Sequence, residues 1–261
     1  MKAREVELQG EGRAIEGYLA EPETQGAHPA LIVVHEIWGL DDHIRDVARR
    51  FAEAGFVALA PDLYTGTWRE AMQPDRIMAG MKFLREAPPE VQRDPSTLGP
   101  LLDARPPEEA AALRTLMRVM TPGQRASFAH DLRGAVRFLR GLPQVDAGRV
   151  ACLGFCMGGG ITAQLSTIEP DLWAAVIFYG ENPPIDHVGE IRAKVLGLYG
   201  GDDVRITANV PEFADAMAAA GKRFSHHVYA GAPHAFFNDT RPSYRPEAAA
   251  DAMRRVLEFL D

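Results

Sequence analysis

A cysteine between two glycines is the residue of this chain best placed for covalent chemistry. It lies in Gly154-Phe155-Cys156-Met157-Gly158, which follows an apolar run predicted as a strand (Val150–Leu153) and precedes a helix predicted from 159 to 166. Such glycines let the chain turn sharply, so that Cys156 is raised above the sheet at a helix N-terminus, where a thiolate is favoured. The alternative is a glycine-rich turn around a buried cysteine. Cys152, inside the predicted strand, is interpreted as a core residue.

A carboxylate and a histidine follow two later strands, in places where they could serve this cysteine. Asp203 comes after the run Val195–Tyr199, and His234 comes after Phe224–Tyr229. Taken alone, His234 could be a surface loop histidine, and Asp203 a turn former or a helix N-cap. Together with the cysteine they predict a catalytic triad. In it His234 is the base and Asp203, in preference to Asp202, orients the base.

The loop after the first predicted parallel strand adds a second carboxylate. His35-Glu36-Ile37-Trp38-Gly39 follows the apolar run Ala30–Val34. Glu36 is expected to face the nucleophile, and a main-chain N–H of this loop to help bind an oxyanion. An exposed loop acid at Glu36 and a core aromatic residue at Trp38 remain alternatives. A nucleophile, a base and oxyanion donors would together perform acyl transfer.

Alternating strands and helices must position these residues. Residues 5–20 predict a hairpin around Gly10-Glu11-Gly12, and short apolar runs then alternate with amphipathic segments such as Ile44–Ala54. Buried strands separated by helices indicate an α/β protein with a mostly parallel twisted sheet flanked by helices. The predicted carboxylate and imidazole then lie at the C-terminal ends of late strands.

The stretch from 65 to 124 interrupts that alternation. It contains two helix-like pieces, Arg69–Glu86 and Glu108–Met120, around a middle rich in proline. About sixty residues with that many prolines would make a poor core of their own. We therefore predict a single domain over residues 1–261, with 65–124 as a helical, cap-like insertion.

The charge and cysteine content exclude several classes of protein. The chain has 28 Lys and Arg against 36 Asp and Glu, a net charge of −8 that gives little support to binding nucleic acid or an anionic membrane surface. It shows neither an apolar run of membrane-spanning length nor a secretory apolar region, so a cytoplasmic protein is expected. The two cysteines match no disulfide framework and the histidines show no metal-ligand spacing, so no metal or cofactor is expected.

Several segments resemble the dienelactone hydrolases, a family with the α/β-hydrolase fold. They are spread over nearly the whole chain: His35-Glu36-Ile37-Trp38-Gly39, Ala60-Pro61-Asp62-Leu63-Tyr64, Gly154-Phe155-Cys156-Met157-Gly158-Gly159, Gly200-Gly201-Asp202-Asp203 and Pro233-His234-Ala235-Phe236. The resemblance implies an α/β-hydrolase fold. It also implies a cysteine hydrolase similar to carboxymethylenebutenolidase, which cleaves a small-molecule ester or lactone through a thioester intermediate.

The resemblance also implies a role for each matching residue. It implies that Cys156 is the nucleophile, that His234 is its base and that Asp203 orients the base. It also implies that Glu36 accepts the thiol proton, and that the main-chain N–H groups of Ile37 and Met157 form the oxyanion hole. Substrate-binding residues are expected at Trp38, Tyr64, Phe236 and Asn238.

Two positions depart from the pattern of the family. Where dienelactone-cleaving members carry arginines that hold the substrate carboxylate, this chain has Gly66 and Asn238. Neutral esters or lactones are therefore expected as substrates, unless Arg69, Arg241 or Arg245 replaces those arginines. The missing arginines also support the alternative function, a non-hydrolytic ligand-binding or thiol-sensing protein on the same fold.

Overall fold

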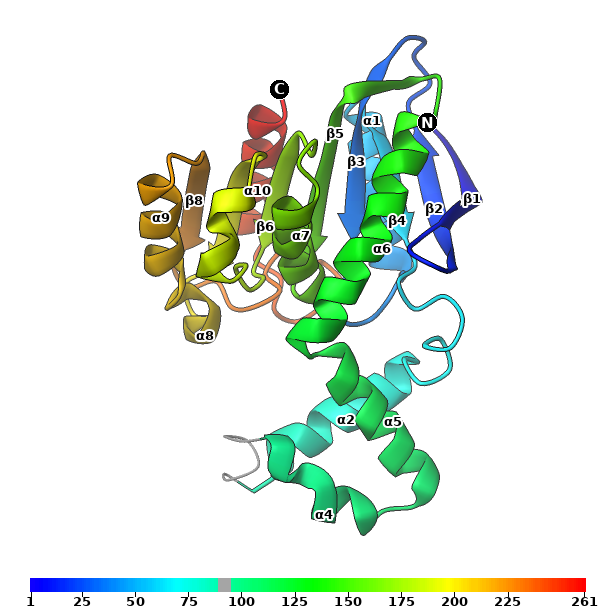
Figure 1. The fold of residues 1–261 in the computed structure, drawn as a ribbon, viewed down its shortest axis with the longest axis vertical. Coiled ribbons are helices and arrows are strands. Elements are labelled where there is room, and N and C mark those ends of the chain that lie inside the picture. The colour runs from blue at the N-terminus through cyan, green and yellow to red at the C-terminus, as the bar shows by residue number, and fades with distance from the viewer. Residues whose placement is uncertain (89–94) are drawn as a thin grey trace. The chain divides into compact units, whose positions relative to one another are not determined.

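Eight strands form one sheet in the computed structural model, which describes residues 1–88 and 95–261 (Figure 1). Their order across the sheet is β1-β2-β4-β3-β5-β6-β7-β8. The strands are β1 (Lys2–Gln9), β2 (Ala14–Glu21), β3 (His28–Val34), β4 (Val57–Pro61), β5 (Val145–Phe155), β6 (Ala174–Phe178), β7 (Lys194–Gly200) and β8 (Phe224–Tyr229).

The sheet is mixed but mostly parallel, as the alternation of strands and helices predicts. β1 and β2 form the expected antiparallel hairpin, and β2 also pairs antiparallel with β4. The remaining neighbours in the sheet pair in parallel. The C-terminal ends of β3 to β8 therefore meet at one edge of the sheet, which brings together loops that lie far apart in the sequence.

Helices cover both faces of this sheet. Figure 1 shows α6 and α7 on one face and α1 and α10 on the other. The helical segments before residue 64 and after residue 121 are α1 (Asp42–Glu53), α6 (Pro122–Arg140), α7 (Met157–Ile168), the 3₁₀ helix η2 (Ile185–Glu190), α8 (Val204–Thr207), α9 (Val210–Ala219) and α10 (Pro246–Phe259). The Asp41 side chain caps α1 by accepting a hydrogen bond from the Ile44 N–H. Residues 30–34 of β3 are fully buried, because helices cover both faces of the central strands.

The chain divides into two compact units, residues 1–63 with 125–261 and residues 64–124. The second unit holds α2 (Pro74–Glu86), the 3₁₀ helix η1 (Pro95–Leu98), α4 (Gly99–Asp103) and α5 (Pro107–Val119). The helix expected over Arg69–Glu86 begins only at Pro74, because proline lacks an N–H and its fixed φ suits the first turn of a helix. Of the proline-rich middle, Pro89 lies outside the described residues.

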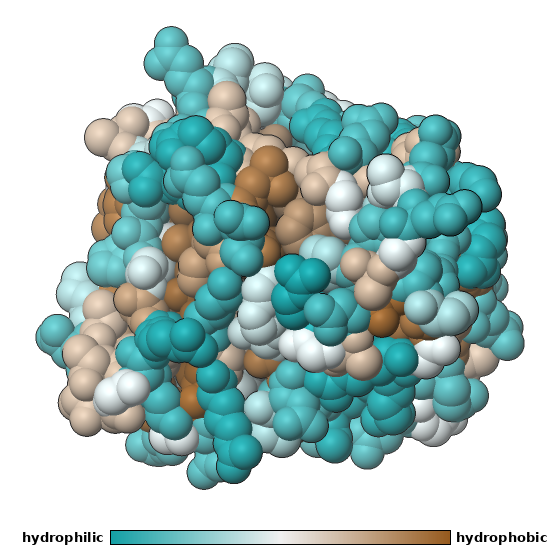
Figure 2. All heavy atoms as spheres, turned by 90° about the horizontal axis from the view of Figure 1, so that it is seen from above, coloured by the Kyte–Doolittle hydropathy of each residue, from teal (hydrophilic) through white to brown (hydrophobic). Residues whose placement is uncertain are grey.

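The surface in Figure 2 is mostly hydrophilic (teal), and hydrophobic residues (brown) form patches between the hydrophilic ones. This mixture agrees with a chain in which 25% of the residues are charged. Within the part of the chain that the structure describes, no helix has both the length and the apolar character that crossing a bilayer requires.

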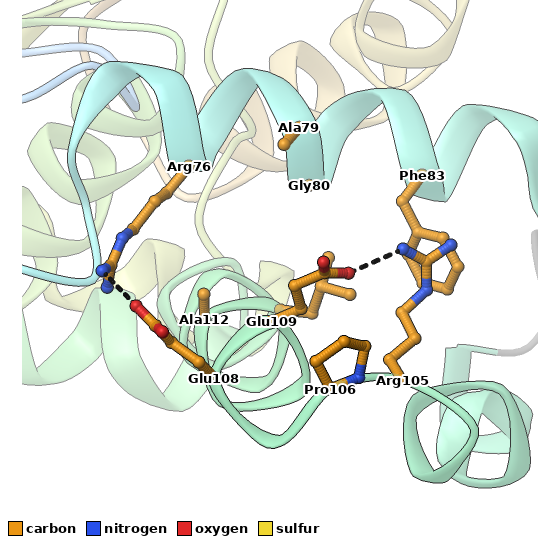
Figure 3. Close-up of a pocket in the computed structure, with 10 residues that line it drawn as sticks. Arg76, Ala79, Gly80, Phe83, Arg105, Pro106, Glu108, Glu109 and Ala112 are labelled. Carbon is orange, nitrogen blue, oxygen red and sulfur yellow. Dashed lines mark hydrogen bonds and ion pairs between the residues drawn. The ribbon is translucent and has the colours of Figure 1, made fainter.

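A cavity of about 390 Å³ lies within the second unit, between α2 and α5. Two ion pairs flank it: Arg76 with Glu108 at 2.8 Å, and Arg105 with Glu109 at 3.1 Å (Figure 3). The residues that line this cavity include none of the predicted site residues. The predicted catalytic residues lie instead in the loops that follow the strands.

Candidate active site

Cys156 lies at the sharp turn between β5 and α7. Its φ of 53° falls in the left-handed region, which a residue with a Cβ adopts only when the surrounding structure holds it there. Two glycines allow this turn. A Cβ on Gly154 would lie 2.1 Å from the Gly158 carbonyl oxygen, and one on Gly158 would lie 2.4 Å from the carbonyl oxygen of Val34. The half-buried thiol therefore sits at the N-terminus of α7, where main-chain N–H groups favour negative charge.

The side chains of His234 and Asp203 meet at the same edge of the sheet. Asp203 follows β7 and His234 follows β8, and Asp203 Oδ2 accepts a hydrogen bond from His234 Nδ1 at 2.5 Å. Asp202, the neighbour considered as an alternative, is exposed. Burial lowers the pKa of His234, but hydrogen bonds and charges from Asp203 and Cys156 outweigh it and raise that pKa to about 10. The structure thus brings the imidazole together with both the carboxylate and the thiol.

His35 holds the loop that follows β3. Its buried ring donates from Nδ1 to the Glu36 carbonyl oxygen at 2.6 Å and accepts at Nε2 from the Leu63 N–H at 3.2 Å. These two contacts require the neutral ring with its proton on Nδ1, and burial lowers the pKa of His35 accordingly. Ile37 therefore lies in a loop tied to the end of β4, while Met157 is the first residue of α7.

Glu36 is a buried carboxyl group, with only 3% of the residue exposed. Its Oε2 accepts a hydrogen bond from Asn238 Nδ2 at 2.6 Å, and the buried Tyr179 hydroxyl also interacts with this carboxyl group. Burial raises the pKa of Glu36, and the hydrogen bond from Asn238 and the charges of His43 and His234 offset this only in part. A raised pKa suits a carboxyl group that must exchange a proton near neutral pH.

Tyr179 is a residue of this site that the sequence reasoning missed. It follows β6 directly, is fully buried with a φ of 37°, and its ring centroid lies 5.1 Å from that of His234. Burial and the negative charges of Glu36 and Cys156 raise its pKa well above the ordinary value, so its hydroxyl stays protonated. Strand register is the signal that points to it, because β5 and β6 end in register and Cys156 and Tyr179 come next.

The predicted substrate-binding residues lie in different environments. Trp38 is half-buried, and the Arg241 guanidinium stacks on its ring at 4.1 Å from the centroid. Phe236 and Asn238 are fully buried, so neither side chain is exposed to a bound molecule in this structure. Tyr64 belongs to the second unit and is buried there.

Comparison with known proteins identifies the family. The model of the dienelactone hydrolase family matches residues 15–261. The chain belongs to this family. A protein of Saccharolobus solfataricus named "Putative carboxymethylenebutenolidase" is 36% identical over 260 residues, which cover 98% of this chain and 97% of that protein. A protein of Escherichia coli (strain K12) with the same name is 33% identical over 264 residues, which cover 97% of this chain and 84% of that protein.

Solved structures agree with this membership. A crystal structure from Klebsiella pneumoniae, named "Putative Dienelactone Hydrolase", has a TM-score of 0.74 at 29% identity and covers 100% of this chain and 99% of that one. A Porphyromonas gingivalis dipeptidyl peptidase 4 has a TM-score of 0.66 at 13% identity, with 99% of this chain and 35% of that one covered, which shows a shared fold alone. The predicted α/β-hydrolase fold and family resemblance are confirmed. This dienelactone hydrolase family member is a hydrolase, and the alternative of a non-hydrolytic protein is not favoured.

Proposed function

We propose that this hydrolase cleaves small-molecule esters or lactones, with Cys156 as nucleophile and His234, oriented by Asp203, as general base and acid. The observation that carries the proposal is the 2.5 Å hydrogen bond between His234 and Asp203, together with the coupling of His234 to a cysteine held at positive φ. A thiol, an imidazole and a carboxylate joined in this way are what acyl transfer requires. Esters and lactones suit a cysteine nucleophile better than amides, because an alkoxide leaves more readily than an unprotonated amine.

In the proposed reaction, the Cys156 thiolate attacks the carbonyl carbon, and a C–S bond forms as an electron pair moves to the carbonyl oxygen. The N–H groups of Ile37 and Met157 stabilise this oxyanion. As the oxyanion collapses, the C–O bond to the leaving group breaks and His234 donates its proton to the alkoxide. His234 then takes a proton from water, the resulting hydroxide attacks the thioester, and the acid leaves with the thiolate restored.

Glu36 is the group that we propose accepts the Cys156 proton when substrate binds. Its burial, its raised pKa and its interaction with His234 support this role. In the substrate-free protein, a carboxylate near the thiol disfavours a second negative charge. Glu36→Gln should therefore speed the alkylation of Cys156 by iodoacetamide while it lowers ester turnover. Unchanged rates of both reactions would remove Glu36 from the mechanism.

The proposed substrates are neutral, because of where the cationic side chains lie. Asn238, where the family resemblance implies an arginine in dienelactone-cleaving members, is fully buried and hydrogen-bonded to the Glu36 carboxyl group. Arg245 is exposed and donates to nearby main-chain carbonyl oxygens, and Arg69 lies in the second unit. Arg241 stacks on Trp38, which makes it the arginine to test.

Matched substrates that differ only in a carboxylate test this proposal. The neutral form should be preferred in kcat/KM by about tenfold or more, because a carboxylate without its charged hydrogen bond lacks roughly 1.5–3 kcal/mol of stabilisation. Arg241→Gln should leave this preference in place, and Cys156→Ala gives the uncatalysed blank. A preference for the acid form that disappears in Arg241→Gln would contradict the proposal. The absence of turnover with any ester or lactone would overturn the ester and lactone assignment itself.

Three further points rest on the sequence and stay predictions. We propose a cytoplasmic location. We propose no nucleic-acid partner, because the net charge of −8 gives little support to binding anionic polymers. We also propose that the stretch 65–124 is a helical insertion into a single α/β-hydrolase domain.

A further inference from the structure

The turn that follows His234 contains an asparagine whose amide is held in one orientation. Asn238 is fully buried, and its Oδ1 accepts two hydrogen bonds from Thr240, one from the main-chain N–H at 3.1 Å and one from Oγ1 at 2.7 Å. The first of these closes an Asx turn, in which an asparagine side chain binds the main chain two residues further on. A main-chain N–H can only donate, so the amide atom that faces it must be the oxygen.

In this orientation the NH2 group of Asn238 points at Glu36. Asn238 Nδ2 donates a hydrogen bond to Glu36 Oε2 at 2.6 Å, and both side chains are buried. Such a bond is stronger to a carboxylate than to a neutral carboxylic acid. A rotated amide could instead accept a proton from a neutral Glu36, but its nitrogen would then face the N–H of Thr240 and both groups would be donors. Thr240 therefore decides that Asn238 acts on Glu36 as a donor.

A second contact joins the same two segments of the chain. The guanidinium of Arg241, three residues after Asn238, stacks on the ring of Trp38, two residues after Glu36, at 4.1 Å from the centroid. The main chain between the two contacts is closed by a hydrogen bond from the Arg241 N–H to the Asn238 carbonyl oxygen at 3.2 Å. The turn 238–241 thus contacts the loop after β3 at two points, which suits it to hold a side chain of that loop in place.

We propose that Asn238, held by Thr240, is a positioning residue for the reaction: its amide N–H keeps the Glu36 carboxyl group in place and ionised, so that Glu36 can accept the proton of Cys156. In that step the S–H bond breaks, the sulfur keeps the electron pair, and an O–H bond forms on Glu36. Asn238 makes and breaks no covalent bond. The inference rests on the role proposed above for Glu36. The hydrogen bond from Asn238 lowers the pKa of Glu36 against the effect of burial, which agrees with it.

The charges around Glu36 stay in place when Asn238 is changed. The titratable and charged groups of the neighbouring loops and of α1 are His43, Cys156, Tyr179, His234, Asp239 and Arg241. Tyr179 stays neutral, because burial and nearby negative charge raise its pKa well above the ordinary value. An apolar substitution at Asn238 therefore removes the fixed donor without removing a charge.

The pH profile of kcat/KM for a neutral aryl ester tests the inference. Without the donor, Glu36 is protonated up to a higher pH, so the acid limb of the profile should move up by about one pH unit in Asn238→Leu, which has a similar volume. Asn238→Asp should move the limb further, by about two units, because two facing carboxyl groups disfavour the ionisation of both. Asn209→Asp, at an exposed asparagine, is the matched control and should leave the limb in place.

A pair of variants at Thr240 tests the support of the amide and also serves if the Asn238 variants do not fold. Thr240 is exposed, so both variants are compatible with the fold. Thr240→Val removes one of the two donors to Asn238 Oδ1 and should move the limb in the same direction by about half a unit. Thr240→Ser keeps the hydroxyl and should retain the parent profile. A limb that moves equally in both variants would contradict the inference.

The Glu36→Gln background separates the remaining outcomes. In that background, Asn238→Leu should cause no further shift, because the group on which Asn238 acts is gone. If Glu36→Gln changes the profile but the limb stays in place in Thr240→Val and in every folded Asn238 variant, the inference is wrong while the role of Glu36 stands. If Glu36→Gln leaves the profile unchanged, the role of Glu36 fails and the inference fails with it. A rate that falls equally at every pH in these variants would show a purely structural role and would overturn the inference.

Discussion

Two cysteines near the end of β5 have opposite environments. Cys152, in the interior of the strand, is fully buried, lies 3.3 Å from Thr162 Oγ1, and has a pKa that burial raises to about 12. Cys156, just past the end of the strand, is half-buried at positive φ and interacts with His234. Desolvation opposes a thiolate inside the sheet, whereas helix N–H groups and an imidazolium favour one at its edge. Position relative to the strand, rather than residue type, therefore distinguishes the proposed nucleophile from the core cysteine.

Removing each sulfur in turn should separate the two cysteines by the largest difference in activity. Cys156→Ala should lower kcat/KM for a neutral aryl ester by on the order of 10⁴-fold, because it removes the nucleophile. Cys152→Ala is the matched control and should keep most of the activity, since its sulfur touches no reacting group. Equal losses in the two variants, with circular dichroism showing both folded, would contradict the assignment.

A second test removes the group that orients the base. Asp203→Asn should lower kcat/KM by about 10³-fold, because the amide cannot stabilise the imidazolium or fix the tautomer of His234. Asp202→Asn, at the exposed neighbour, is the matched control and should have little effect. Loss of activity in the control alone would transfer the role to Asp202.

Alkylation rates distinguish the two thiols without a measurement of turnover. In the native protein, iodoacetamide should alkylate Cys156 about 100-fold or more faster than Cys152, because burial keeps Cys152 protonated and out of contact with the reagent. Peptide mass mapping at timed quenches measures both rates. Unfolding the protein in guanidinium chloride should bring the two rates together. A native Cys152 that reacts as fast as Cys156 would show that the strand interior is accessible.

A further test is the titration of His234, whose pKa is raised to about 10 in part by its hydrogen bond with Cys156. A hydrogen bond that favours the imidazolium raises the pKa of the ring, so removing its partner should lower the pKa of His234. Cys156→Ala should therefore lower the pKa, measured by NMR titration of the ring, by about one unit or more. In Cys152→Ala the pKa should stay as in the parent, and a shift of equal size there would argue against a specific pairing.

Much of the fold is readable from the sequence, because local patterns determine it. The hairpin, the buried strands and the glycine-flanked cysteine were predicted from residue types and spacing. Helix boundaries were less accurate where several residues could begin a helix, as the start of α2 at Pro74 instead of Arg69 shows.

The parts of the site that were missed depend on contacts between distant segments. The hydrogen bond from the Asn238 side chain to Glu36 joins two segments that lie far apart in the sequence, and the role of Asn238 in substrate binding stays a prediction. Tyr179 could be found only through the register of β5 and β6. Patterns within one segment do not contain this information.

The central claim, that Cys156 forms a thioester with the substrate, can be tested directly by mass. The protein is mixed with an activated aryl ester, quenched in acid within milliseconds, and its intact mass is measured. The account predicts an added acyl group that hydroxylamine removes, that maps to Cys156, and that is missing in Cys156→Ala but present in Cys152→Ala. Ester hydrolysis without any such adduct, or an adduct of equal yield in Cys156→Ala, would contradict it.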